Sequence, residues 1–275
     1  MRRPGYIDTH SHFQLALGTA LGDAQQAAAD AAGIECIVLC PGDVAGFELA
    51  KAAAHAWGYV YMLGIHPLAA SGAERGDLAL LRRVAVSAMD DPRFIGIGEV
   101  GLDGFEPGID QKKAEDVFVE CLRIARDLDL PLSIHARKSI SRLLACFRRA
   151  APPGGVVHAF NGSDAERDAL LQRGLKLGFG GACTYEGSKR IRRHLAELPD
   201  DAWVIETDAP DMPSSGRRDR HAAGCCSLKT EPADLLETAA AAAALRGISL
   251  DEVASQTRAN AIAAFPRLAS ALALD

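Results

Sequence analysis

This sequence lacks the features that mark secreted and membrane-bound proteins. Its seven cysteines are scattered without a C-x-x-C motif, and a disulfide between the neighbours Cys225 and Cys226 would be strained. The arginines at positions 2 and 3 are not followed by an apolar run, so neither a signal peptide nor a membrane span is visible. We therefore expect reduced thiols and a cytoplasmic location.

Positive charge and aromatic residues are also scarce. The 275 residues carry 30 Lys and Arg against 36 Asp and Glu, a formal net charge of −6. This charge balance argues against a protein that binds nucleic acid over its whole surface, although it permits a local basic rim. Aromatic residues make up 5% of the chain, so base-stacking surfaces of the kind used by single-stranded DNA-binding proteins are not evident.

What the chain does contain is a regular alternation of short apolar segments and longer helical patterns. Strands are expected at 6–12, 34–40, 58–65, 94–98, 132–134, 156–157, 175–181 and 203–205. Helices are expected at 23–32, 47–57, 77–89, 111–128, 139–150, 164–173, 188–198, 232–245 and 250–265. Eight β/α units in about 250 residues predict an α/β protein with a closed (β/α)₈ TIM barrel. The amino-acid composition does not change along the chain in a way that marks a second domain, so one domain over 1–275 is expected.

Metal-binding side chains follow the ends of six of these strands. They are His10, His12, His66, Glu99, His135, His158 and Asp208. Each alone has an ordinary explanation as a satisfied polar residue or a helix cap. Strand ends in a barrel, however, converge on one rim, where catalytic residues sit. The other histidines contrast with this set, because His55 and His194 lie in predicted helices and His221 in a predicted loop.

The chemistry of the set points to metal ions. Four imidazoles and two carboxylates suffice for two divalent ions, and a carboxylate can bridge both through its two oxygens. Because the set contains no thiolate, a structural zinc site is excluded. Imidazole favours zinc and carboxylate favours magnesium, so Zn, Mn, Mg or a mixture of them is expected.

Six motifs occur in order along the chain: DTHSH at 8–12, GIHP at 64–67, IGEVGLD at 97–103, IHAR at 134–137, VHAFNGS at 157–163 and ETDAP at 206–210. A closing TRAN at 257–260 follows them. As a set these motifs resemble the TatD family of metal-dependent hydrolases, which includes TatD-like deoxyribonucleases, within the amidohydrolase-like barrels. The resemblance covers nearly the whole chain.

The resemblance implies a role for each candidate residue. His10, His12 and Asp208 would hold one metal ion, His135 and His158 a second, and Glu99 would bridge them. Asp208 would also take the proton of the attacking water, which makes Asp208 and Glu99 the catalytic residues. His66 and Arg137 would face the phosphate or leaving group of the substrate. For Arg137 this agrees with the match between a guanidinium fork and phosphate oxygens, although a rim salt bridge is the alternative.

Three departures from the family pattern concern the rim. Thr230 stands where the family often has the Asn of Asn-Glu-Pro, and Lys138 stands where an acid is common. The segment 213–226, with Arg217, Arg218 and Arg220, does not align. Either this segment contributes a basic rim together with Arg137 and Lys138, or it is a solvated turn. The departures affect the choice of substrate more than the hydrolytic chemistry.

These observations favour a deoxyribonuclease that cleaves phosphodiester bonds with water activated by two metal ions. A 3′-to-5′ exonuclease acting on single-stranded DNA is the preferred version. The alternative is a hydrolase of small ester, lactone, amide or aminoacyl substrates with the same metal core. A metal-binding scaffold without catalysis is disfavoured by the intact ligand set. The sequence indicates neither a membrane nor a protein partner.

Overall fold

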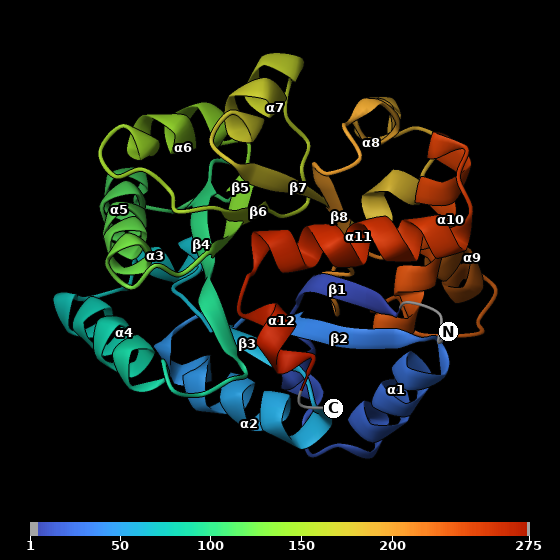
Figure 1. The fold of residues 1–275 in the computed structure, drawn as a ribbon, viewed down its shortest axis with the longest axis horizontal. Coiled ribbons are helices and arrows are strands. Elements are labelled where there is room, and N and C mark those ends of the chain that lie inside the picture. The colour runs from blue at the N-terminus through green and yellow to red at the C-terminus, as the bar shows by residue number, and fades with distance from the viewer. Residues whose placement is uncertain (1–4, 274–275) are drawn as a thin grey trace.

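The computed structural model describes residues 5–273, which form a barrel of eight parallel strands surrounded by helices (Figure 1). The strands are hydrogen-bonded in chain order, β1 to β8. Backbone hydrogen bonds from Asp208 N to His10 O (2.9 Å) and from His12 N to Ala209 O (2.7 Å) join the segment that follows β8 to the end of β1. The strands are β1 (Tyr6–Ser11), β2 (Ile34–Leu39), β3 (Val60–Leu63), β4 (Phe94–Asp103), β5 (Leu132–Arg137), β6 (Gly155–Val157), β7 (Leu175–Phe179) and β8 (Trp203–Ile205).

Helices cover the outside of the barrel and connect successive strands (Figure 1). They are α1 (Ala20–Ala31), α2 (Phe47–Trp57), α3 (Pro67–Ala70), α4 (Arg75–Ser87), α5 (Gln111–Asp127), α6 (Ile140–Phe147), α7 (Asp164–Leu171), α8 (Lys189–Glu197), α9 (Ser215–Ala222), α10 (Leu235–Arg246), α11 (Leu250–Ala264) and α12 (Leu268–Ala271). Short 3₁₀ turns are η1 (Phe13–Ala16), η2 (Val44–Gly46), η3 (Gly181–Thr184) and η4 (Pro232–Asp234).

Two apolar cores result from the alternation of side chains along each strand. In β2, Ile37 and Leu39 are buried against the helices, whereas Cys36 and Val38 are buried in the cluster that fills the barrel. The inner cluster also takes in Phe265 and the apolar side of α12. The C-terminal segment therefore fills the end of the barrel where the strands begin, and the other end remains for polar residues.

The structure confirms the predicted (β/α)₈ barrel and corrects several details. Prediction from sequence missed α3, α9 and α12, and it ended the fourth strand at 98, whereas β4 continues to Asp103. The predicted loop around the three arginines contains α9, whose first turn is capped by the Ser214 side chain accepting from Arg217 N (3.0 Å). His221 therefore lies in a helix and not in a loop. Within residues 5–273, no helix has the length and apolar character that a bilayer crossing needs.

Candidate metal centre

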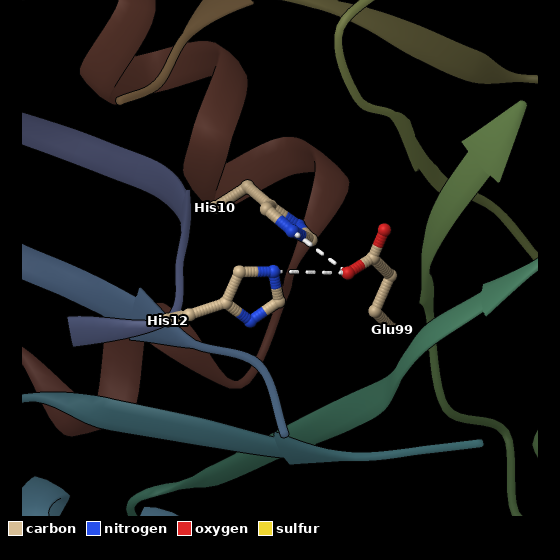
Figure 2. A group of neighbouring side chains, drawn as sticks. All are labelled: His10, His12 and Glu99. Atoms are coloured by element: carbon tan, nitrogen blue, oxygen red, sulfur yellow. Dashed lines mark ion pairs between the residues drawn. The ribbon is translucent and has the colours of Figure 1, made fainter. Parts of the chain in front are cut away.

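The carboxylate of Glu99 lies at the centre of a histidine cluster at the end of the barrel where the strands finish. Oε2 of Glu99 is 3.2 Å from Nε2 of His10 and 3.2 Å from Nε2 of His12. Figure 2 shows these two imidazoles pointing at the same oxygen. The other oxygen, Oε1, faces a different set: Nε2 of His66 at 3.3 Å, Nδ1 of His135 at 2.9 Å and Nε2 of His158 at 2.8 Å. Glu99 thus presents one oxygen to each of two groups of imidazoles.

Asp208 adds a second carboxylate on the side of His10 and His12. Its Oδ1 lies 3.6 Å from Nε2 of His10 and 3.5 Å from Nε2 of His12. Asp208, the third residue after β8, adopts a left-handed backbone conformation (φ +58°). The structure therefore brings together all six side chains for which the sequence predicts metal binding. Their assignment as ligands remains a prediction.

Local irregularities in two strands aim the central side chains inward. The pairing of β1 with β2 shifts register between Asp8 and Ser11, and His10 lies within this shift. The pairing of β4 with β5 shifts between Ile97 and Val100, and Glu99 lies within that shift. Irregularities of this kind redirect a side chain and are frequent next to active sites.

Gly101 allows β4 and β5 to stay close beyond the register shift. Its φ of +144° is a backbone conformation that side chains rarely adopt, and a Cβ at this position would overlap the carbonyl oxygen of His135. Glycine is therefore required at this position in the motif that carries Glu99.

The second nitrogen of four of the five imidazoles has a hydrogen-bond partner that fixes the orientation of the ring. Nδ1 of His10 is 2.7 Å from Ser133 Oγ, and Nδ1 of His12 is 2.6 Å from the carbonyl oxygen of Cys40. Nε2 of His135 pairs with Asp103 Oδ2 (3.1 Å), and Nδ1 of His66 accepts from the Leu68 amide (3.1 Å). Nδ1 of His158 lies 3.7 Å from Glu206 Oε1, too far for a hydrogen bond, and is buried without a hydrogen-bond partner among the described residues. Asp103 thus orients His135, and Glu206 lies beside His158. Asp8, a third buried carboxylate near the cluster, accepts from Thr207 N at 2.9 Å and binds no imidazole among residues 5–273.

Burial and charge set opposite protonation tendencies in the cluster. Burial works against ionisation of Glu99, but attraction by His10, His66 and His158 outweighs it and holds the Glu99 pKa well below its usual range. Burial, followed by repulsion from His158, lowers the pKa of His10 to about 3. Burial also opposes protonation of His12, His135 and His158, but their carboxylate neighbours raise the pKa of His12 to about 9 and raise the pKa values of His135 and His158 as well. A cation bound by these imidazoles must therefore displace their protons, whereas His10 is already neutral.

The unsatisfied atoms of the cluster indicate what is needed to complete it. Nε2 of His10, Oε2 of Glu99 and Oδ1 of Asp208 are buried and lack a hydrogen-bond partner among the described residues. Leaving such atoms unpaired is costly. Three groups of donor atoms lie within 4.8 Å of one another: His10, His12 and Glu99; His10, His158 and Asp208; and His66, Glu99 and His135. Divalent cations fit this set of nitrogen and oxygen donors.

His66 lies closer to this cluster than a purely substrate-facing role requires. The resemblance places it against the phosphate or leaving group, and the structure puts it in one of the three donor groups. Its side chain is 14% exposed, so the ring also borders the open rim. Contact with substrate at this position remains a prediction.

Adding divalent metal ions should raise the thermal stability of chelator-treated protein. At about 100 times the dissociation constant, a ligand that binds only the folded state adds roughly 2.7 kcal/mol, a rise in Tm of about 5–10 °C for a chain of this size. Calorimetry with and without Zn²⁺, Mn²⁺ or Mg²⁺ measures the shift. His12→Ala should lose most of it. His55→Ala, which removes a histidine paired with Asp91 on the outer surface, should keep it. Equal shifts in both variants would contradict the proposed ligands.

Only part of the predicted basic rim is available to a substrate. Arg217 is buried and paired with Glu231 and Asp234, at 3.0 and 2.8 Å. Arg220 is paired with Asp234 and Glu237. By contrast, Arg137 and Lys138 are exposed, and neither forms an ion pair with any residue in the described range 5–273. Arg218 is also exposed without an ion pair among these residues, and its guanidinium lies over the ring of Tyr185. Arg137 and Lys138 lie two and three residues beyond His135 and supply the uncompensated positive charge at the end of β5.

A (β/α)₈ barrel with imidazoles and carboxylates at the carboxyl ends of its strands is suited to metal-dependent hydrolysis. The chain belongs to the TatD family, because the family model described as TatD related DNase matches residues 7–266. It is a metal-dependent hydrolase of that family.

Relatives and solved structures agree with this placement. The chain is 31% identical over 240 residues to "Uncharacterized metal-dependent hydrolase YjjV" of Escherichia coli K12, covering 83% of this chain and 92% of the relative. It is 34% identical over 206 residues to "3′-5′ ssDNA/RNA exonuclease TatD" of Erwinia amylovora, covering 74% and 76%. The crystal structure of the YjjV protein of E. coli K12, described as a TatD homologue, superposes with a TM-score of 0.86 at 28% identity, over 95% of this chain and 98% of that one.

Proposed function

We propose that the chain is a deoxyribonuclease that binds two divalent ions and removes nucleotides from the 3′ end of single-stranded DNA. The observation that carries the proposal is the division of the Glu99 carboxylate between two groups of imidazoles, one on each oxygen. A bridging carboxylate needs this arrangement. The name of the Erwinia amylovora relative supports the choice of substrate and polarity.

Each residue then has a defined task. His10, His12 and Asp208 would hold one ion, His135 and His158 the other, with Glu99 between them. When bound, the ions supply hydroxide at neutral pH and neutralise charge on the phosphoryl group. Oδ1 of Asp208, buried and without a hydrogen-bond partner among the described residues, accepts the proton of the attacking water. The orienting partners of the imidazoles keep this arrangement in place before the substrate arrives.

Arg137 holds the phosphate next to the scissile bond. Its guanidinium has no carboxylate partner in residues 5–273, so its charge is available to a phosphate oxygen. It extends from the same strand as His135, which fixes its position relative to the metal centre. Lys138 adds a second charge beside it.

A hydrolase of small ester, lactone, amide or aminoacyl substrates is the second candidate. Its supporting observation is a cavity of about 240 Å³ whose lining includes Ile65, the residue before His66. The cavity is lined by Asp43, Val44, Ile65, Ala69, Gly72, Ala73 and Asp77. The volume is below the roughly 300–1,000 Å³ of ordinary ligand pockets, so only a small substrate would fit in it. The two candidates differ in whether substrate binding depends on salt.

The KM for single-stranded DNA should rise steeply with salt. With two to three phosphate contacts, an increase from 50 to 200 mM NaCl is expected to raise KM about tenfold, because binding a phosphate releases counterions. The assay uses 5′-end-labelled DNA with Mg²⁺, Mn²⁺ or Zn²⁺, with and without chelator. A metal-dependent ladder that shortens from the 3′ end supports the proposal. Intact DNA together with turnover of a neutral ester at salt-independent KM would select the second candidate.

A further inference from the structure

We propose that Phe105, together with Arg137 and Lys138, forms a platform on which an unpaired base of the substrate stacks beside the metal centre. The proposal rests on the nuclease function proposed above and adds the element that selects a single strand. It assigns a task to Phe105, a residue outside the metal cluster. We call these three side chains the stacking platform.

The contacts of Phe105 set it apart from the other aromatic residues. Its side chain is 47% exposed, in the connection between β4 and α5. The guanidinium carbon of Arg137 lies 3.8 Å from the ring centroid, and Nζ of Lys138 lies 4.5 Å from it. Single exposed apolar side chains are common on protein surfaces, so exposure alone does not distinguish Phe105. Its ring, however, contacts two cations that have no ion-pair partner among residues 5–273.

The turn that carries Phe105 is held firmly. Oδ1 of Asp103 accepts hydrogen bonds from Phe105 N (2.7 Å) and Glu106 N (2.9 Å). The amide of Gly104 donates to the carbonyl of Arg137 at 2.7 Å. A Cβ on Gly104 would come within 2.5 Å of the Lys138 carbonyl, so glycine permits this close approach of the two strand ends.

The same carboxylate connects the platform to the metal centre. While Oδ1 of Asp103 holds the turn, Oδ2 lies 3.1 Å from Nε2 of His135. Asp103 and Arg137 are also paired residues in the register of β4 with β5. The position of the ring is therefore fixed relative to a predicted metal ligand, as a platform next to the scissile bond requires.

The chemistry of the three side chains matches a nucleotide of a single strand. An aromatic ring and a guanidinium plane both stack on bases, and cations bind the adjoining phosphates. A base in a duplex is already stacked and paired and so is not available to the platform. Tyr185 and Arg218 form a similar contact at 4.8 Å, but the Tyr185 hydroxyl donates to the backbone carbonyls of Pro213 and Ser214, which indicates a structural role there.

The test uses oligonucleotides in which one of the three 3′-terminal nucleotides is replaced by an abasic residue. The wild-type enzyme should lose about tenfold in kcat/KM when the missing base is the one that stacks. Phe105→Ala should cleave intact DNA about tenfold more slowly, mainly through KM, and should no longer distinguish intact from abasic DNA. Phe105→Trp should restore the discrimination, and Phe105→Leu, which keeps apolar volume without a π face, should not.

The control is Leu250→Ala, an equally exposed apolar residue (47%) at the start of α11, beside the beginning of β1. It should leave both activity and discrimination unchanged. If the wild-type enzyme cleaves DNA but ignores the abasic residues, or if Phe105→Ala keeps the discrimination, the platform is wrong and the nuclease function stands. If metal-loaded wild-type enzyme cleaves no DNA, both proposals fall together.

Discussion

Replacing Glu99 by glutamine is expected to abolish hydrolysis, with a fall in kcat of roughly a thousandfold or more. Glutamine keeps the size of the side chain but removes the negative charge and turns one oxygen into an NH₂ donor. One of the two sets of histidines would then face the amide NH₂ of the glutamine, and no cation could be shared between that set and residue 99. Metal analysis of the purified variant should show the loss of at least one ion per chain.

Glu35→Gln supplies the matched control for this prediction. It makes the same chemical change on β2, where Glu35 pairs with Arg258 through two contacts of 2.6 and 2.9 Å on the outer surface. Its activity and metal content should equal those of the wild-type enzyme. The far-UV circular dichroism of both variants should be unchanged. Full activity and full metal content in Glu99→Gln would refute the bridging role.

The barrel and the identity of the clustered residues were predictable because both depend on local patterns. Alternating β/α segments give the architecture, and a barrel brings all strand ends to one rim. The position of Glu99 inside β4, and not at its end, was not predictable. A register shift depends on how two strands pair, and β5 begins more than thirty residues after Glu99.

The orienting partners of the histidines show a second limit. Ser133 and the carbonyl of Cys40 hold His10 and His12, and neither contact has a sequence signature. A backbone carbonyl can serve as a partner whatever the residue type. Phe105 shows a related limit, because the 5% aromatic content gave no sign that one ring would be exposed next to two free cations. The amino-acid composition gives the number of aromatic residues but not their positions in the fold.

Helix α9 was missed because long-range ion pairs, and not an apolar stripe, hold it in place. Only Arg217 of its eight residues is buried, and the guanidinium Nε donates to Asp234 Oδ2 at 2.8 Å. Arg220 donates to the other oxygen of Asp234 at 3.0 Å. Charged residues at this spacing indicate a solvated segment when only the sequence is available. The structure shows that one of them serves as the anchor.

Arg217→Ala should therefore destabilise the protein far more than Arg220→Ala. The Arg217 side chain is 5% exposed and that of Asp234 is 7% exposed. Removing the guanidinium of Arg217 leaves the buried Asp234 carboxylate without its main partner, which should lower the free energy of unfolding by about 3 kcal/mol. The Arg220 side chain is 45% exposed, and solvent screening limits its contribution to about 1 kcal/mol or less. Both variants lose an arginine from the same helix that pairs with the same carboxylate. The difference between their free energies of unfolding therefore reports the effect of burial.

Urea unfolding followed by circular dichroism measures both free energies, and Arg217→Met provides a variant that keeps the apolar volume of the side chain. Arg217→Met should remain about as destabilised as Arg217→Ala, because the carboxylate and not the missing methylene groups determines the cost. Combining Arg217→Met with Asp234→Leu should recover part of the loss, since it removes the buried unpaired carboxylate. The other partner of Arg217, Glu231, remains, but its side chain is 28% exposed and is solvated. Equal effects of Arg217→Ala and Arg220→Ala would show that solvent reaches both ion pairs and that α9 is held by other contacts.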